Sequence, residues 1–134
     1  MGPHSWVALV TIAALLVYFW MGIRVAGARR VSGVQAPAMT GDPVLERHIR
    51  VQANTLEWLP IFLPALWLFA IYWNDLIAAG LGVVWIVGRL LYAFGYVADP
   101  GKRELGFIIQ FVAAAALLLG AAGRIIWILV TVGA

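Results

Sequence analysis

The N-terminal stretch is the most constraining feature of this chain, because residues 1–23 contain no Asp, Glu, Lys or Arg. A helix that crosses a bilayer needs about 20 mostly apolar residues, and the segment from Ser5 to Ile23 reaches that length. Three further apolar segments follow, and four such helices with short connections would use nearly all of the 134 residues. The sequence therefore predicts an all-α integral membrane protein, built as a bundle of four transmembrane helices.

Composition agrees with a chain that lies in lipid and excludes several other classes of protein. The chain is 64% hydrophobic and 11% charged, which is far outside the usual range of soluble domains. Its net charge of +3 would suit nucleic acid, but the basic residues flank the apolar segments and form no solvated stripe. With no cysteine, the chain has no thiolate nucleophile and no Cys-ligated metal. Any reactive sulfur must therefore come from a ligand.

Turn-forming residues divide the chain into its expected helices. Pro43 suits the first turn of a helix, Asn74-Asp75 makes a tight turn, and Asp99-Pro100-Gly101 breaks the chain. We expect one transmembrane domain that covers residues 1–134. Its helices are predicted at about 5–30, 44–73, 76–97 and 103–131.

The distribution of Lys and Arg predicts the orientation in the membrane. These residues are concentrated after the first and third predicted helices, whereas the N-terminus and the turn at Asn74 have none. The positive-inside rule places basic connections in the cytoplasm, so both termini should face the opposite side. Arg124 is expected to snorkel to that outer boundary. The aromatic residues expected at the same boundary are Trp6, Tyr72, Trp73 and Trp127.

A stripe of polar side chains runs along the second predicted helix. Arg50, Asn54 and Glu57 are spaced at i, i+4 and i+7, so they share one helix face that extends toward the bilayer. One interpretation is structural, in which these groups join helices through ion pairs and hydrogen bonds. Ionisable groups inside a membrane are costly, however, and usually mark the path of a ligand or an ion. The stripe therefore favours a functional site.

The third predicted helix carries a second polar face. Arg89, Tyr92 and Tyr96 are spaced at i, i+3 and i+7. The two tyrosines would also fit an aromatic belt near the cytoplasmic interface. A guanidinium as deep as that of Arg89 favours a site instead. It requires either a ligand or a carboxylate partner, such as Glu46 or Glu57.

More basic residues converge on the same membrane face. Arg103, with Lys102 before it, opens the fourth predicted helix, while Arg29 and Arg30 close the first. Most of these polar groups are cations or hydrogen-bond donors, so they imply a small anionic ligand. His48 has no partner at metal-ligand spacing, and we expect no metal site. The sequence also lacks a Ser-His-Asp set, a glycine-rich phosphate loop and a paired-carboxylate site.

Three sequence motifs, in order along the chain, resemble those of the MAPEG family, the membrane-associated proteins of eicosanoid and glutathione metabolism. The resemblance covers roughly residues 5–130. The motifs are Glu46-Arg47 through Arg50-x-Gln52-x-Asn54-x-x-Glu57, with Pro60 and Leu66-Trp67 after it; Gly88-Arg89-x-x-Tyr92-x-x-Gly95-Tyr96; and Arg103 before Gly106-Phe107. This family includes microsomal glutathione transferases and leukotriene C4 synthase. Membership implies a homotrimer of four-helix subunits, with glutathione bound between neighbouring subunits near the cytoplasmic face.

The resemblance also assigns roles to individual residues. It implies that Arg103 activates the glutathione thiol, and Arg30 is the next candidate for that role. Gln52 and either Arg29 or Arg30 would reach the ligand from an adjacent subunit. Trp58 stands where leukotriene-forming members have tyrosine, so it keeps a stacking surface but lacks the hydroxyl. The residues implied to hold the tripeptide within one subunit are Arg50, Asn54, Glu57, Tyr92 and Tyr96.

The expected activity is that of a membrane-bound glutathione transferase that attacks hydrophobic electrophiles, and reduction of lipid hydroperoxides fits the same chemistry. Two alternatives stay open. A non-catalytic lipid-binding member of the family would keep the fold, but the presence of Arg103 argues against it. A four-helix efflux transporter would use Glu57 to exchange protons for a cation, and a site rich in arginine suits such a cargo poorly.

Overall fold

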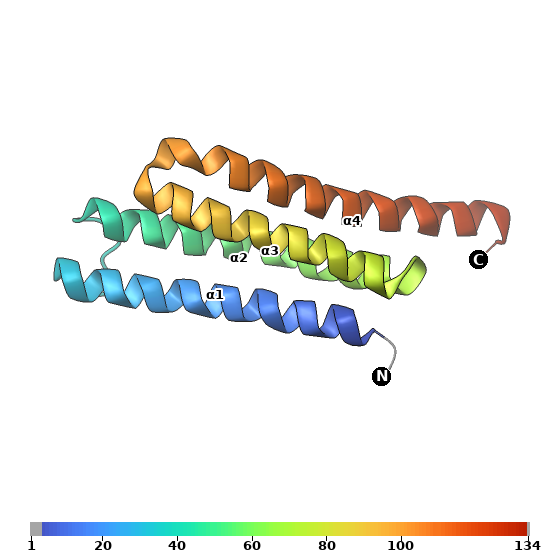
Figure 1. Ribbon diagram of the computed structural model, residues 1–134, viewed down its shortest axis with the longest axis horizontal. Coiled ribbons are helices and arrows are strands. Elements are labelled where there is room, and N and C mark those ends of the chain that lie inside the picture. Colours follow the sequence, from blue (N-terminus) through green and yellow to red (C-terminus); the bar gives the residue numbers. More distant parts are fainter. Residues whose placement is uncertain (1–3, 134) are drawn as a thin grey trace.

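The computed structural model describes residues 4–133 and shows four long helices lying side by side (Figure 1). It confirms the all-α fold of four helices, each long and apolar enough to cross a membrane. The connections between the first two and the last two helices lie at one end of the bundle. The start of α1, the end of α4 and the turn between the middle helices lie at the other. The elements are α1 (Ser5–Ser32), α2 (Pro43–Tyr72), α3 (Asp75–Ala98), the short 3-10 helix η1 (Pro100–Arg103) and α4 (Glu104–Thr131).

Side-chain caps explain where the middle helices begin. The Asp42 carboxylate accepts a hydrogen bond from the Leu45 amide at 3.0 Å, and Pro43 occupies the first turn of α2. The Asn74 side-chain oxygen accepts from the Ile77 amide at 2.9 Å, and so caps α3. Each cap satisfies an amide that has no acceptor within its own helix. The two helices therefore start at fixed positions relative to the polar residues that follow.

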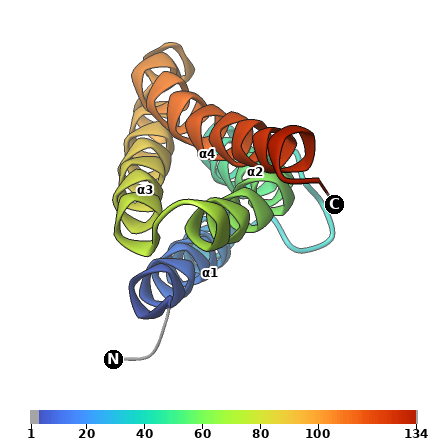
Figure 2. The ribbon, with the colours of Figure 1, turned by 90° about the vertical axis from the view of Figure 1, so that its right-hand side faces the viewer.

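Glycines let α3 and α4 approach closely at the end of the bundle where η1 joins them. A Cβ atom on Gly88 would lie 2.6 Å from the amide nitrogen of Gln110, and one on Gly106 would collide with the backbone of Tyr92. Only hydrogen fits between the two backbones at these positions. Figure 2 shows the result, in which α4 begins beside α3 and then crosses toward α2. This crossing sets the distance between the start of α4 and the tyrosines of α3.

Apolar side chains fill the interior of the bundle and also cover much of its outside. Phe62 of α2 stacks on Trp85 of α3, with ring centroids 3.9 Å apart and planes within 3°. Val7, Leu66 and Leu117 are fully buried around this pair. Large apolar residues are also exposed along all four helices. That distribution fits a bundle surrounded by lipid, in which helix exteriors need not be polar.

At each end of the bundle, an arginine side chain joins two helices. Arg47 donates to the carbonyl oxygens of Val97 at 3.1 Å and of Ala98 at 3.4 Å, at the C-terminal end of α3. A cation at this position also suits the negative end of the helix dipole. At the opposite end, Arg124 donates to the Tyr72 carbonyl at 3.3 Å and packs over the ring of Trp127. Its place among exposed aromatic residues fits the interface role expected for it.

Candidate functional site

A polar pocket of about 410 Å³ lies between α2, α3 and the start of α4. It is at the end of the bundle that carries the charged connections. It brings together five of the ten residues that the sequence singled out for binding or catalysis. The lining residues are Arg50, Asn54, Tyr92, Tyr96, Arg103 and Phe107.

Aromatic rings form the wall of this pocket. The centroids of the Tyr92 and Tyr96 rings are 5.6 Å apart, and the Tyr92 and Phe107 centroids are 6.1 Å apart. The guanidinium carbon of Arg103 lies 5.7 Å from the centroid of Tyr96, within the range of a cation–π contact. The side chains of Arg50 and Arg103 are both exposed. Their donors are therefore available to a ligand in the pocket.

Arg89 lies behind the pocket rather than in its lining. Its side chain is completely buried, and it donates to the Asn54 side-chain oxygen at 3.0 Å and to the Thr55 hydroxyl at 2.7 Å. Its guanidinium carbon is 4.4 Å from the centroid of the Tyr92 ring. Of the two partners that the sequence allowed, a carboxylate or a ligand, the structure shows no carboxylate beside Arg89 within residues 4–133. Neutral oxygens and an aromatic face contact this cation, and its Nε atom has no hydrogen-bond partner there.

The charge of the pocket is positive. Two guanidinium groups line it, that of Arg89 lies directly behind it, and no carboxylate is in its lining. Within residues 4–133, no cluster of three or more His, Asp or Glu side chains offers a place for a metal ion. Guanidinium groups bind carboxylates through paired, charge-assisted hydrogen bonds. The arrangement therefore suits a small organic anion, with flat groups packed against the tyrosine rings.

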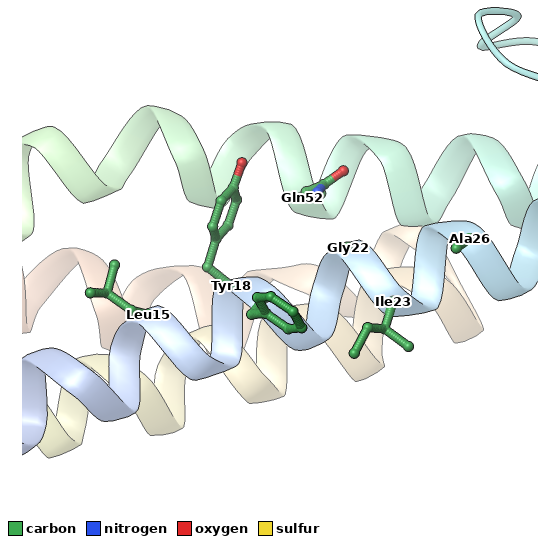
Figure 3. Close-up of a pocket in the computed structure, with 7 residues that line it drawn as sticks. Leu15, Tyr18, Gly22, Ile23, Ala26 and Gln52 are labelled. Atoms are coloured by element: carbon green, nitrogen blue, oxygen red, sulfur yellow. The ribbon is translucent and has the colours of Figure 1, made fainter.

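Gln52 lies on a different face of α2 and lines a groove against α1. The groove has a volume of about 570 Å³, and Leu15, Tyr18 and Gly22 line its α1 side. Figure 3 shows the Tyr18 ring extending from α1 toward α2, with Gln52 on the facing helix. Within one chain, the structure does not bring Gln52 into the pocket that contains Arg50.

Arg29 and Arg30 form a separate polar hollow at the end of α1. This hollow of about 400 Å³ includes the loop from Gly33 to Ala36. Arg29 also donates to the Ala38 carbonyl at 2.6 Å, which ties the end of α1 to the loop. Neither arginine lines the pocket within the same chain.

Glu57 and Trp58 lie further along α2 and also stand outside the pocket lining. Glu57 is exposed on the flank of the helix, about 10 Å along the helix axis from Arg50. Trp58 packs edge-on against both Phe107 and Phe111, with centroid distances of 5.8 Å in each case. It lines an apolar groove of about 270 Å³ between α2 and α4. Phe107 lines the polar pocket and packs against Trp58, which lines the groove.

A sequence model of the MAPEG family matches residues 7–123 of the chain. The chain belongs to the MAPEG family. It is 48% identical over 122 residues to an uncharacterized protein of Synechocystis, covering 91% of this chain and 89% of that protein. It is 39% identical to microsomal glutathione S-transferase 2 of Homo sapiens, covering 91% and 84%. It is also 33% identical to leukotriene C4 synthase of Bos taurus, covering 95% and 77%. This MAPEG chain is accordingly an integral, multi-pass membrane protein.

Two residues of this MAPEG site did not emerge from the sequence as functional. Phe107 follows Arg103 by four positions, so helical spacing alone would have put both on one face of α4. Thr55 gives no comparable signal, because its role depends on a hydrogen bond from Arg89 on another helix. Spacing within one helix can therefore find residues that share a face. It cannot identify a partner on a neighbouring helix.

Proposed function

We propose that this protein is a membrane-bound glutathione transferase and that the polar pocket is its glutathione site. The single observation that carries the proposal is the convergence of Arg50 and Arg103 on one aromatic-walled pocket with no carboxylate in its lining. Family membership and the names of the relatives support a glutathione-related membrane enzyme. Glutathione has carboxylates, which suit the guanidinium group of Arg50, and a thiol, which the cysteine-free chain lacks and whose thiolate suits that of Arg103.

The proposed mechanism is activation of the thiol as a thiolate. A thiol with a pKa of about 8.5 is only about 3% ionised at pH 7, and the thiolate is the nucleophile. Arginine stays protonated and cannot remove the proton, so Arg103 acts by stabilising the thiolate charge. Lowering the thiol pKa by about two units requires about 2.7 kcal/mol. One guanidinium in a partly desolvated pocket is able to supply that amount.

Residues outside the pocket complete the site in the proposed homotrimer. Gln52 and either Arg29 or Arg30 would reach glutathione from a neighbouring copy, and Glu57 would bind its ammonium group. The exposure of Glu57 supports this role, because a carboxylate on the flank of a membrane helix needs a polar partner. Arg30 remains the second candidate for thiol activation.

The second substrate is proposed to reach the thiolate from the lipid through the apolar groove beside Trp58. Phe107 lines the polar pocket and packs on Trp58, so the groove and the pocket adjoin. Trp58, Ile61 and Phe111 give the groove an apolar lining. This surface suits a hydrophobic electrophile for conjugation, or a lipid hydroperoxide for reduction.

The test is calorimetric titration of the detergent-purified protein with glutathione, followed by an assay with a halodinitrobenzene as electrophile. We expect saturable binding of glutathione and formation of the thioether. Binding without turnover would support the non-catalytic alternative. Failure to bind glutathione, together with proton-driven uptake of a cationic dye into proteoliposomes, would support the transporter and refute the proposal.

A further inference from the structure

Arg89 occupies a position that neither the pocket lining nor the proposed mechanism explains. It is fully buried, and its guanidinium donates to Asn54 at 3.0 Å and to Thr55 at 2.7 Å. A buried cation is costly in a membrane protein, so such a group usually has hydrogen-bond partners and belongs to a functional site. Two of its neighbours, Asn54 and Tyr92, are also pocket residues. Arg89 is therefore linked directly to the binding surface.

We propose that Arg89 is a positioning residue that orients Asn54 and Tyr92 for binding the ligand. This inference rests on the proposed function and assigns a determinant of affinity within the same site. The Asn54 oxygen accepts from Arg89, so its amide N–H groups are left to face other partners. Asn54 then presents donors, not an acceptor, to a carboxylate in the pocket. Within residues 4–133, the hydrogen bond from Arg89 is the one that holds the Asn54 amide in this orientation.

A contact between Arg89 and the Tyr92 ring also orients a residue of the pocket wall. The guanidinium carbon lies 4.4 Å from the ring centroid, and that ring packs against Tyr96 and Phe107 in the pocket wall. A cation–π contact holds the ring face toward the arginine. The buried guanidinium of Arg89 thus orients both Tyr92, in the pocket wall, and Asn54, which donates to the ligand.

The position of Arg89 separates this role from direct ligand binding. Its side chain has no exposed surface and does not line the pocket, whereas Arg50 and Arg103 are exposed and do. Its effect on glutathione must therefore pass through Asn54 and Tyr92. Thiol activation belongs to Arg103 in the proposed mechanism, so loss of Arg89 should weaken binding far more than it slows chemistry.

The experiment is a double-mutant cycle of Arg89→Met and Asn54→Ala, with glutathione Kd, KM, kcat and the pH–rate profile measured for each protein. We expect Arg89→Met to raise the Kd and KM by about tenfold or more, with kcat reduced less than threefold and an unshifted pH profile. The glutathione Kd of the double variant should be no higher than that of the single variant with the higher Kd, because both substitutions remove the same Arg89–Asn54 arrangement. Arg89→Lys should restore part of the affinity, since lysine keeps the charge but cannot donate in a fork.

Two controls separate positioning from loss of fold and from failure of the proposed function. Leu117→Ala removes a fully buried leucine that does not line the pocket, and it should lower the melting temperature while leaving the glutathione Kd unchanged. If Arg89→Met does not fold, the same cycle is run with Arg89→Lys. Wild-type affinity in the folded Arg89 variants, or additive losses in the cycle, would overturn the positioning role. Absence of glutathione binding by the wild-type protein would instead refute the proposed function.

Discussion

Arg50 and Arg103 share the pocket but differ in position, and this difference assigns them separate tasks. Arg50 belongs to α2 and stands beside Asn54, within the polar stripe of that helix. Arg103 ends η1, directly before α4. Its side chain rests near the Tyr96 ring at the edge of the pocket wall. We therefore assign ligand carboxylates to Arg50 and the developing thiolate to Arg103.

The first prediction is that Arg103→Ala separates chemistry from binding. Loss of its charge should lower turnover at neutral pH by about 10- to 100-fold, which corresponds to one or two units of thiol pKa. The glutathione Kd should change much less. The pH–rate profile should move upward, because a thiol with a higher pKa forms thiolate only at higher pH. Turnover against pH, with thiolate absorbance followed in parallel, measures both effects.

Matched variants distinguish this result from general damage to the site. Arg50→Ala and Glu57→Ala should mainly abolish glutathione binding, whereas Arg103→Lys should recover part of the lost rate because it keeps a cation near the sulfur. Wild-type turnover with an unshifted profile in Arg103→Ala would contradict the assignment. Arg30 would then be the residue to test.

At the residue scale, helical spacing predicted part of the set of side chains that line one pocket, but not the partners of each. The spacing of Arg50 and Asn54, and that of Tyr92 and Tyr96, correctly indicated two polar helix faces, and the structure brings them together. The partners of Arg89 could not be predicted, because spacing does not reveal that neutral oxygens on α2 accept from its two terminal nitrogens, while its Nε atom has no partner among the described residues.

At the scale of the helices, the pocket depends most on the close crossing of α3 and α4. Gly88 and Gly106 allow backbone contact there, and the crossing places Arg103 beside Tyr96. The sequence contained these glycines within the motifs, but their purpose depends on the geometry between two helices. A single-helix pattern gives no information about how closely a second helix approaches.

The second prediction compares two glycines of α4. Gly106→Ala should destabilise the protein by about 1–3 kcal/mol, because its methyl group meets the backbone of α3 and must push the helices apart. Glutathione affinity should fall as well, since Arg103 would move away from the tyrosines. Gly123→Ala is the control. No atom lies within 4 Å of its added methyl, and alanine favours a helix by up to about 1 kcal/mol.

Thermal unfolding in detergent and glutathione titration measure both variants of this pair. The expected order of melting temperature is Gly123→Ala at or above wild type, with Gly106→Ala clearly below it. Equal melting temperatures and equal Kd values for Gly106→Ala and wild type would contradict the role given to the crossing.

For the whole molecule, the arrangement of charge predicts the orientation across the membrane. The end of the bundle with the α1–α2 loop carries Arg29 and Arg30, while the turn at Asn74 has no basic residue. Basic connections stay in the cytoplasm, so the pocket should open there and both termini should face the other side. The third prediction is that a cysteine introduced by Gln35→Cys reacts with an impermeant maleimide only from the cytoplasmic side.

The natural absence of cysteine gives this labelling experiment a clean background. Val132→Cys is the matched variant at the opposite end of the bundle, and both native side chains are exposed. It should react only from the non-cytoplasmic side. Labelling of Val132→Cys from the cytoplasm alone would reverse the orientation.

One flank of α2 carries polar groups that a single chain surrounded by lipid would leave without partners. Proline has no amide hydrogen, so Pro60 and Pro64 leave the carbonyls of Leu56 and Pro60 without helical donors. Glu57 and both prolines are exposed on the described chain. Lipid offers no hydrogen bonds to such groups, so another copy is expected to cover this flank. In the sequence, the homotrimer was implied only by the family resemblance, and this exposed flank became evident only with the fold.

The last prediction is that three copies form a closed ring. The groove lined by Gln52 and the flank that carries Glu57 lie on different faces of the chain. When the Gln52 face of one copy contacts the Glu57 flank of the next copy, the contact is head-to-tail. Such contacts close into a ring when the rotation between copies allows it, and three is the smallest ring of this kind, which is also the state that the family resemblance implies. Native mass spectrometry in detergent should therefore show three subunits.

Gln52→Ala and Glu57→Ala subunits, each unable to bind glutathione alone, should regain some binding when mixed and reassembled, because a contact between one mutant of each kind retains both native side chains. A stable monomer that binds glutathione with full affinity would rule out a site shared between copies.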